Sequence, residues 1–385
     1  SLKPWTAETA PDFDSGGSGS KVRIADCNMD PNITTGGGGV TLTLSGDCEF
    51  DAVTVSSGDE FDLNGQRAEF GGDVTYSGTW DADGLAVFHG GFTKYGTLNN
   101  AASGDIMTMH PTGYPTFSYI TGYRTFFVNG GVQLGTGGFT NVPTAIMASG
   151  ILKTGTRDPT ATNFTIATGA EFQAEDNTLT VSGDFTTSGG LIGTSALNTQ
   201  YAATRADAVD ALRISGDRTI EFWLKYPSSN RPSSGNFKLL VSKDNYGYFV
   251  KLDENGKVKA GITSGASSSV TSATAVDDDK WHHIAWVFTT STADTGNRVY
   301  IDGKLDAQAS SNGGNTGEAV TFTVGSGVSG SCMDEIRLWN DARTEAEIRA
   351  NMFSEITSSG NDIIAVYNAN EGSGTTAADA IGSLD

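Results

Sequence analysis

The sequence is short of cysteine and of long apolar runs. Three cysteines in 385 residues are too few for a disulfide scaffold, and an odd number leaves at least one thiol outside any internal pair. Cys27 and Cys48 either form a disulfide between adjacent β-rungs or remain two buried thiols. No cysteine spacing is typical of a zinc site. No apolar run approaches the roughly 20 residues that cross a bilayer, so no membrane insertion is predicted.

Basic charge is also scarce. The chain has 24 Lys and Arg against 45 Asp and Glu, which gives a formal net charge of −21. Nucleic-acid binding needs a basic face, and docking on an anionic membrane needs the same. Neither partner is predicted. The acidity instead suits a soluble surface in salty water, where salt screens the repulsion between carboxylates.

What the chain has in excess is glycine, with 50 residues, alongside many small and β-branched residues. This composition favours an all-β chain of short strands and tight turns. The length allows two domains of ordinary size. The chain begins at Ser1 with no charged stretch followed by an apolar core, so either a signal or propeptide has been removed or the sequence is part of a longer product.

Residues 1–20 predict an N-terminal arm. They include Pro4, Pro11 and a Gly/Ser run over Ser15–Ser20, and they lack apolar periodicity. The arm is either a disordered tail or a tether that orders against a neighbouring subunit.

Residues 21–194 predict stacked strand–turn units. Val40, Leu42 and Leu44 alternate with threonines, and Val53–Phe61 matches Phe164–Phe172 without gaps. One such unit cannot close a core, but stacked units can. We therefore expect a β-solenoid or a related sheet-rich stalk.

The stretch near residues 80–160 is less regular and rich in aromatic residues. It is an inserted β-lobe, a different sheet or an intersubunit surface. A core role is favoured for its aromatics over a sugar-stacking or subunit-packing platform. His89 and His110 have no ligand partner at metal spacing and are interpreted as ordinary polar residues. The aromatics in question are Phe117, Tyr119, Tyr123, Phe126 and Phe127.

The second half, residues 195–385, predicts an antiparallel sandwich. Asn255–Gly256 and Asp302–Gly303 are hairpin turn signals. Thr344 and Glu347 form a capping box that starts a short helix. Trp281–Phe288 is apolar on both faces after its histidines, as expected of a central strand. The other predicted strands are Thr219–Lys225, Leu239–Lys243, Tyr248–Leu252 and Val299–Ile301.

These segments together resemble a laminin-G-like, concanavalin A-like jelly roll. The segments that carry the resemblance are Thr219–Lys225, Lys280–Ala285, Val299–Leu305, Met333–Thr344 and Ile364–Thr376. The resemblance implies a binding or structural domain of the kind found on extracellular proteins and virion appendages. That family usually continues through one more turn and strand, so either the last strand is lost here or the product is longer.

Catalysis is possible in the wider superfamily, whose glucanases carry the pattern Glu-x-Asp-x-x-Glu on one strand. No such triplet occurs in this sequence. Asp334 and Glu335 are adjacent, so on a strand they point to opposite faces and cannot act on one bond. Glu335 and Arg337 are expected to form a same-face surface pair at the sandwich edge. We predict no catalytic and no cofactor-binding residues, and hence no enzyme.

Two polar clusters remain as candidates for a metal or a base. His282 and His283 face apart on a strand and are interpreted as structural. Asp277, Asp278 and Asp279 are candidate calcium ligands, because Ca²⁺ takes several carboxylate oxygens. The alternative is a solvated acidic loop. Calcium is the cofactor considered, and the glycan-binding residues are not identified by the sequence.

The N-terminal repeats, with runs such as Asn177–Gly190, resemble structural proteins of marine phages. This resemblance implies a virion structural protein, namely a capsid fibre, decoration or tail spike at the virion surface. Its partners would be further copies of itself, with a trimer favoured, other virion proteins and host-surface glycans. The alternative is a secreted or cell-surface adhesin, or a surface-layer-like protein, of a marine prokaryote. A polysaccharide-cleaving enzyme ranks third.

Overall fold

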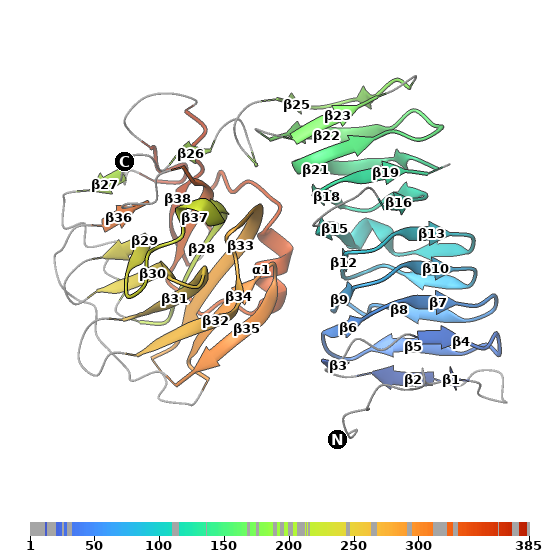
Figure 1. Ribbon diagram of the computed structural model, residues 1–385, viewed down its shortest axis with the longest axis horizontal. Helices are drawn as coiled ribbons and strands as arrows, with labels where there is room; N and C mark the ends of the chain where they lie inside the picture. The colour runs from blue at the N-terminus through green and yellow to red at the C-terminus, as the bar shows by residue number, and fades with distance from the viewer. Residues whose placement is uncertain are drawn as a thin grey trace. The chain divides into compact units, whose positions relative to one another are not determined.

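The computed structural model divides into two compact units, Ser1–Thr187 and Ser188–Asp385 (Figure 1). The structure describes residues 12–13, 21–24, 27–28, 33–109, 115–135, 137–167, 170–174, 177–187, 191–192, 196–198, 203–205, 212, 214, 216–243, 247–262, 268–290, 295–310, 322–325, 330–360, 362–371 and 377–382.

The N-terminal unit is a β-solenoid whose short strands pair in parallel and form three faces, as predicted for the fold class. The first face contains β1 (Asp12–Phe13), β4 (Ile33–Thr35), β7 (Val53–Val55), β10 (Val74–Tyr76), β13 (Phe92–Lys94), β16 (Thr116–Phe117), β19 (Val132–Leu134), the end of β21 (Val142–Lys153) and β23 (Ala170–Gln173). The second face contains β2 (Lys21–Ile24), β5 (Thr41–Leu44), β8 (Glu60–Asp62), β11 (Thr79–Asp81) and β14 (Thr97–Asn99), with β17 (Ile120–Thr121) and β20 (Phe139–Thr140) paired to each other. The third face contains β3 (Cys27–Asn28), β6 (Cys48–Phe50), β9 (Arg67–Phe70), β12 (Leu85–Phe88), β15 (Asp105–Met109), β18 (Thr125–Asn129), the start of β21, β22 (Thr160–Ile166), β24 (Thr180–Val181) and β25 (Phe185–Thr186).

One turn of the solenoid brings Cys48 beside Ala68, and the next turn brings Ala68 beside Ala86. The structural period is therefore far shorter than the spacing between the two matching segments of the sequence. Those segments also lie on different faces, since Val53 belongs to the first face and Phe164 to the third. The same alternation of inward apolar and outward threonine residues suits every face, so similar segments recur on different faces.

The structure bears on two further predictions for the N-terminal unit, the pairing of Cys27 with Cys48 and the N-terminal arm. Cys27 and Cys48 are register partners on adjacent strands, which meets the geometric condition set for a disulfide without deciding between the two alternatives. Of the N-terminal arm, the described pair Asp12–Phe13 runs parallel to β4. The rest of the arm lies outside the described residues.

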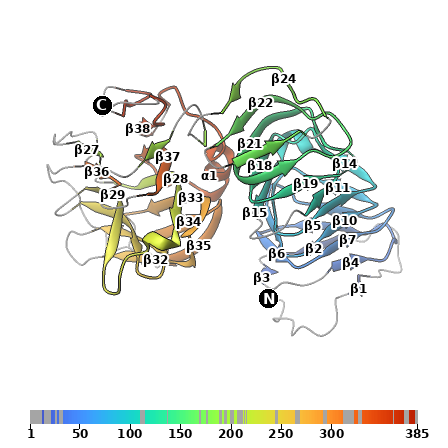
Figure 2. The same cartoon turned by 45° about the horizontal axis from the view of Figure 1, so that its top comes forward.

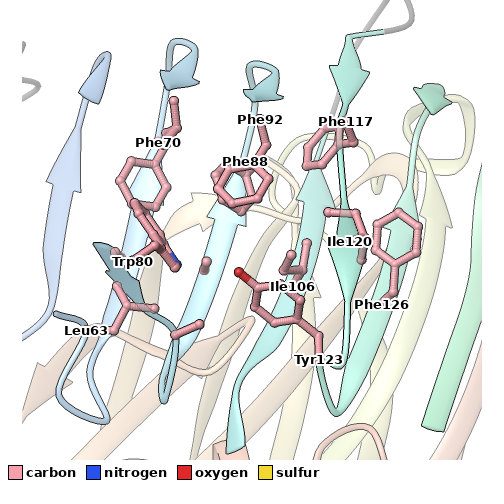
Figure 3. Close-up of a cluster of buried hydrophobic side chains, with 14 of the residues drawn as sticks. Leu63, Phe70, Trp80, Phe88, Phe92, Ile106, Phe117, Ile120, Tyr123 and Phe126 are labelled. Carbon is pink, nitrogen blue, oxygen red and sulfur yellow. The ribbon is translucent and has the colours of Figure 1, made fainter. Parts of the chain in front are cut away.

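The solenoid core is a stack of apolar side chains, many of them aromatic (Figure 3). Phe50 stacks on Phe70 at 5.5 Å between ring centroids, and Phe70 stacks on Phe88 at 5.1 Å. Trp80 stacks on Phe61 at 4.9 Å. Since equivalent residues on successive turns face inward in register, like side chains meet like, and each aromatic pair adds about 0.5–1.5 kcal/mol beyond its buried area.

The aromatic stretch near residues 80–160 continues the same ladder. Its strands β15 and β18 pair with the turns before and after them. Phe117, Tyr123 and Phe126 belong to the solenoid core, which confirms the role predicted for them. Phe127 is buried but lies outside that core, and Tyr119 is partly exposed. His110 lies outside the described residues.

Carboxylates hold the corners of the solenoid together. Asp59 accepts the backbone N–H groups of Gly37, Gly39 and Val40 at 2.7, 2.8 and 2.9 Å. Asp73 accepts the N–H of Gly91 at 2.6 Å, one turn further on. Several of the acidic residues therefore act as acceptors for backbone donors that the turns leave unpaired.

The C-terminal unit is a sandwich of two antiparallel sheets, as the jelly-roll prediction requires (Figure 2). The first sheet has the order β26 (Leu197–Asn198), β37 (Cys332–Trp339), β28 (Arg218–Pro227), β33 (Asp278–Phe288), β34 (Asn297–Ile301) and β35 (Lys304–Ala309), and β38 (Ile363–Tyr367) also pairs with β37. The second sheet has the order β27 (Ala203–Arg205), β36 (Phe322–Val324), β29 (Phe237–Lys243), β30 (Tyr248–Asp253), β31 (Lys257–Ile262) and β32 (Ser269–Ala275).

The sequence predictions for this unit are confirmed in their main features. The core between the sheets takes Ile220, Phe222 and Leu224 from β28, as their alternation predicts. β33 lies between β28 and β34, in the middle of its sheet. Both predicted hairpins form, and Gly256 and Gly303 have the positive φ angles (73° and 72°) that their turns require.

The helix α1 (Glu345–Asn351) packs on the first sheet. Thr344 accepts the backbone N–H of Glu347, and the Glu347 carboxylate accepts the N–H of Thr344, so the predicted capping box is present. Ile348 packs against Ala285, Val287 and Tyr300. Among the described residues, no helix has the length and apolar character needed to cross a membrane.

Candidate functional site

The C-terminal unit buries an ionic cluster on the helix side of the first sheet. Arg337 donates to the Glu335 carboxylate at 2.7 Å and to Glu221 at 3.4 Å. The Trp339 indole N–H also donates to Glu221, at 3.0 Å. The three ionisable side chains are no more than 1% exposed. The predicted pair of Glu335 and Arg337 is thus confirmed, but its expected position at the surface is wrong.

The segment that follows α1 closes over this cluster. Arg337 donates to the backbone carbonyl groups of Asn351, at 3.0 Å, and Ser354. Trp223 donates its indole N–H to the carbonyl of Met352 at 2.8 Å. The guanidinium therefore fastens the segment to the sheet. The expectation that this region forms the sandwich edge is also wrong, because β37 has β28 on one side and β26 and β38 on the other.

Asp334 and Glu335 bond different partners, but the prediction that they point to opposite faces is wrong, because the strand bulges between the core residues Met333 and Ile336 and leaves both carboxylates on the outer side. Asp334 accepts the N–H groups of Leu191 and Ile192 at 2.8 and 3.0 Å. Glu335 sits at a β-bulge with φ of 50°, where the register against β28 shifts. A non-glycine residue at positive φ inside a strand is strained, and here the strain turns Glu335 toward Arg337.

His283 completes the cluster without acting as a cation. Its Nε2 lies 3.7 Å from a Glu221 oxygen, and its ring meets Trp223 edge to face at 5.2 Å. Burial and the nearby Arg337 charge hold the pKa of His283 well below its usual range, so its imidazole is neutral. Burial raises the pKa of Glu335, although Arg337 opposes this. The cluster contains acid and base side chains, and all of them are buried.

His282, the neighbour of His283 on β33, contacts two carboxylates outside the ionic cluster. Its Nδ1–H donates to Asp302 at 2.8 Å and its Nε2–H to Asp278 at 3.0 Å. Burial alone would lower the pKa of His282, but the Asp302 charge and the bonds to both carboxylates outweigh burial and raise it to about 10. The imidazolium therefore ties β33 to the β34–β35 turn, which agrees with the predicted structural role.

The calcium candidates diverge in the structure. Buried Asp277 takes a bidentate bond from Arg231, with Nη2–Oδ1 at 2.9 Å. Exposed Asp278 contacts His282 and Lys280, the latter at 2.8 Å. Asp279 is exposed and has a positive φ of 64°. A calcium ion would have to displace the cations that already neutralise Asp277 and Asp278, so calcium stays a prediction.

Two further polar groups lie on the solenoid. His89 contacts Glu69 at 2.7 Å, and Glu69 also bonds Arg67. The carboxylates of Asp62, Asp81 and Asp83 have oxygens within 4.8 Å of one another, a grouping that the sequence did not reveal because the residues come from two turns. Backbone or side-chain N–H groups already bond each of them, from Asn64, Asn100 and Gly65 in turn.

The outer face of the second sheet carries an exposed aromatic side chain close to lysines. Phe237 is 49% exposed there, beside Phe249, Lys251 and Lys259. Sequence reasoning missed these residues, although their signal was present. Phe249 and Lys251 alternate with the core residues Val250 and Leu252, which places them together on the outward face.

Comparison with known families and structures identifies the class of the C-terminal unit. Residues 197–349 match the laminin G family model of the concanavalin A-like lectin/glucanases superfamily. This unit therefore has a concanavalin A-like, lectin-type fold, in agreement with the two-sheet architecture. No curated protein matches the chain.

Several solved binding domains are similar to part of the chain. The binding domain of paraclostridial mosquitocidal protein 1 is 16% identical with a TM-score of 0.31, and the match covers 37% of each chain. The binding domain of botulinum neurotoxin DC, solved in complex with SialylT, is 13% identical with a TM-score of 0.30, again over 37% of each chain. Botulinum neurotoxin type C, whose cell entry depends on two ganglioside molecules, is 14% identical with a TM-score of 0.30, over 37% of this chain and 38% of that one. The matches thus span well under two thirds of these proteins.

Proposed function

We propose that the protein is a non-enzymatic carbohydrate-binding protein, in which the lectin-type unit binds glycans and the solenoid is a stalk. The observation that carries this proposal is the closed ionic cluster. The superfamily contains both lectins and glucanases. In this chain two carboxylates on the central strands, Glu221 and Glu335, bond Arg337 beneath a covering segment. Most glycosidases use two carboxyl groups that reach one bond, so this arrangement supports binding over cleavage.

Exposed aromatic side chains support binding of a glycan. Pyranose rings have apolar C–H faces. These faces pack on exposed aromatic side chains, and the contact removes apolar surface of both partners from water. Phe237 in the C-terminal unit and Tyr95 in the solenoid are 49% and 75% exposed. Exposed large apolar side chains in a chain of net charge −21 are candidates for such contacts.

The proposed setting is the surface of a virion, where the protein would be a capsid fibre, decoration or tail spike and would assemble with copies of itself, a trimer being favoured. The stacked turns support a stalk, since each turn buries its apolar face on its neighbours. The second candidate is an adhesin or surface-layer-like protein on a marine prokaryote, because the lectin-type fold serves that role equally well.

The binding proposal is tested with the full chain on a panel of immobilised polysaccharides, neutral and acidic, using biolayer interferometry. Saturable binding to at least one glycan is expected, and absence of binding across the panel would overturn the proposal. Mass photometry and negative-stain imaging separate the two settings. Trimers attached to particles are expected, while monomers attached to cell envelopes would exclude the virion role.

A further inference from the structure

The outer face of the second sheet carries what we call the aromatic–lysine surface, made of Phe237, Phe249, Lys251 and Lys259. Lys251 of β30 and Lys259 of β31 are register partners, directly opposite each other on neighbouring strands. The next partner in the row is exposed Thr271 of β32. The row crosses the sheet on the side away from the core.

Lys251 is held in place by two aromatic rings. Its Nζ lies 3.8 Å from the centroid of Phe237 and 4.9 Å from that of Phe249. A cation at these distances is attracted by the electron-rich face of the ring. Burial and the charge of Lys259 lower the pKa of Lys251. The two ring contacts therefore hold the ammonium group in position before any ligand binds.

The two charges lack a carboxylate partner within the part of the chain that the structure describes. The next outward residue of β30, Asp253, directs its carboxylate to the N–H groups of Asn255 and Lys257, at 2.8 and 3.0 Å. Like charges directly opposite on a sheet destabilise it. The chain has 45 acidic residues with which to neutralise 24 basic ones, yet no carboxylate among the described residues pairs with these two lysines. An anion from outside the molecule would remove that repulsion.

We propose that the aromatic–lysine surface binds an acidic glycan, one that carries carboxylate or sulfate groups on its sugar rings. The lysines take the acidic groups, and the exposed face of Phe237 takes the apolar C–H face of a sugar. The paired requirement for charge and ring stacking favours a glycan over an acidic peptide, since the latter uses the charge alone. This inference rests on the proposed function and specifies its ligand class.

The test measures binding of the full chain to immobilised polygalacturonate and heparin, with dextran as a neutral glycan and polyglutamate as a non-sugar anion. The variants are Phe237→Ala and Lys251→Gln/Lys259→Gln. The matched control, Lys94→Gln/Lys153→Gln, removes the same charge from the N-terminal unit. Circular dichroism and thermal melting establish that each variant is folded.

The wild type is expected to bind one or both acidic glycans and to bind dextran and polyglutamate at least 10-fold more weakly. The double lysine variant should lose at least 10-fold in affinity and Phe237→Ala about 5-fold, with the control within 2-fold. Polyglutamate binding equal to that of the glycans would overturn the glycan assignment. Glycan binding that the double lysine variant retains would overturn the surface assignment and leave the proposed function standing. Binding to no glycan would overturn both.

Discussion

Arg337 is the residue on which the buried ionic cluster depends. Its guanidinium bonds the buried carboxylates of Glu335 and Glu221 and two backbone carbonyl groups. Sequence spacing correctly paired Glu335 with Arg337, because residues two apart share a face of a strand. It could not reveal the burial, since Glu221 comes from a strand far away in the sequence and the covering segment comes from beyond the helix.

Replacing Arg337 is therefore expected to be costly. The change Arg337→Met should lower the free energy of unfolding of the C-terminal unit by about 3–5 kcal/mol, because it leaves buried carboxylates without a counter-charge. Urea denaturation followed by tryptophan fluorescence measures the loss. The matched control Glu345→Gln removes the partially exposed pair with Arg349 on α1 and should cost at most about 0.5 kcal/mol. Similar losses in the two variants would contradict the importance assigned to the cluster.

His282 is a second residue whose charge state carries stability. Its folded pKa of about 10 lies above the unfolded value near 6.5. The stabilisation is thus complete below about pH 6.5 and is lost as the pH rises toward 10. The free energy of unfolding should fall over this window by on the order of a few kcal/mol.

The pH dependence is measured by urea denaturation between pH 6 and pH 10. The variant His282→Gln keeps a polar side chain and removes the titration, so its stability should be flatter with pH over the same window. A wild-type curve parallel to that of the variant would show that the imidazolium does not contribute.

At the scale of elements, the strands and turns were more predictable than their stacking. Alternating Val40, Leu42 and Leu44 identified inward faces, and all three are buried. The number of residues in one turn of the solenoid could not be predicted. All three faces share one alternating pattern, so the sequence does not indicate which strand belongs to which face. The contacts between successive turns of the solenoid depend on backbone positions, which the identity of the side chains does not indicate.

Glycines at the solenoid corners illustrate these contacts. A Cβ added at Gly104 would lie 1.6 Å from the carbonyl oxygen of Ala82, one turn earlier. One added at Gly71 would meet nothing closer than 3.6 Å. Gly104→Ala must therefore separate the rungs, whereas Gly71→Ala is accommodated.

We expect Gly104→Ala to cost at least about 3 kcal/mol, at the severe end of single substitutions. Hydrogen exchange with mass spectrometry should show lost protection in peptides that contain residues 79–88 and 104–109. Gly71→Ala, the control, should leave protection unchanged within about 0.5 kcal/mol. Unchanged protection in Gly104→Ala would mean that the corner has more room than the described backbone allows.

At the scale of the whole molecule, the net charge of −21 opposes the compact state through self-repulsion. Raising NaCl from low concentration to about 0.2 M screens charges more than roughly 10 Å apart. The melting temperature should rise by roughly 2–5 °C and then level off, equivalent to about 1–2 kcal/mol. Sucrose at matched osmolality, the control, does not screen charge and should not reproduce the plateau. A melting temperature that falls with salt would show that attractive ion pairs dominate.

Composition predicted the fold class at this scale, but it could not reveal the proposed aromatic–lysine surface. Four residues from three strands form the aromatic–lysine surface, and only the hairpin register brings Lys251 opposite Lys259. A local cationic surface is invisible in a total of 45 acidic and 24 basic residues.

The central claim, that the lectin-type unit binds glycans and does not cleave them, is tested most directly by incubating the full chain with polygalacturonate and, separately, with heparin. Bound protein and newly formed reducing ends are measured in the same samples. The account predicts saturable binding to at least one of the two glycans with no increase in reducing ends. A rise in reducing ends that Glu221→Gln or Glu335→Gln abolishes would contradict it.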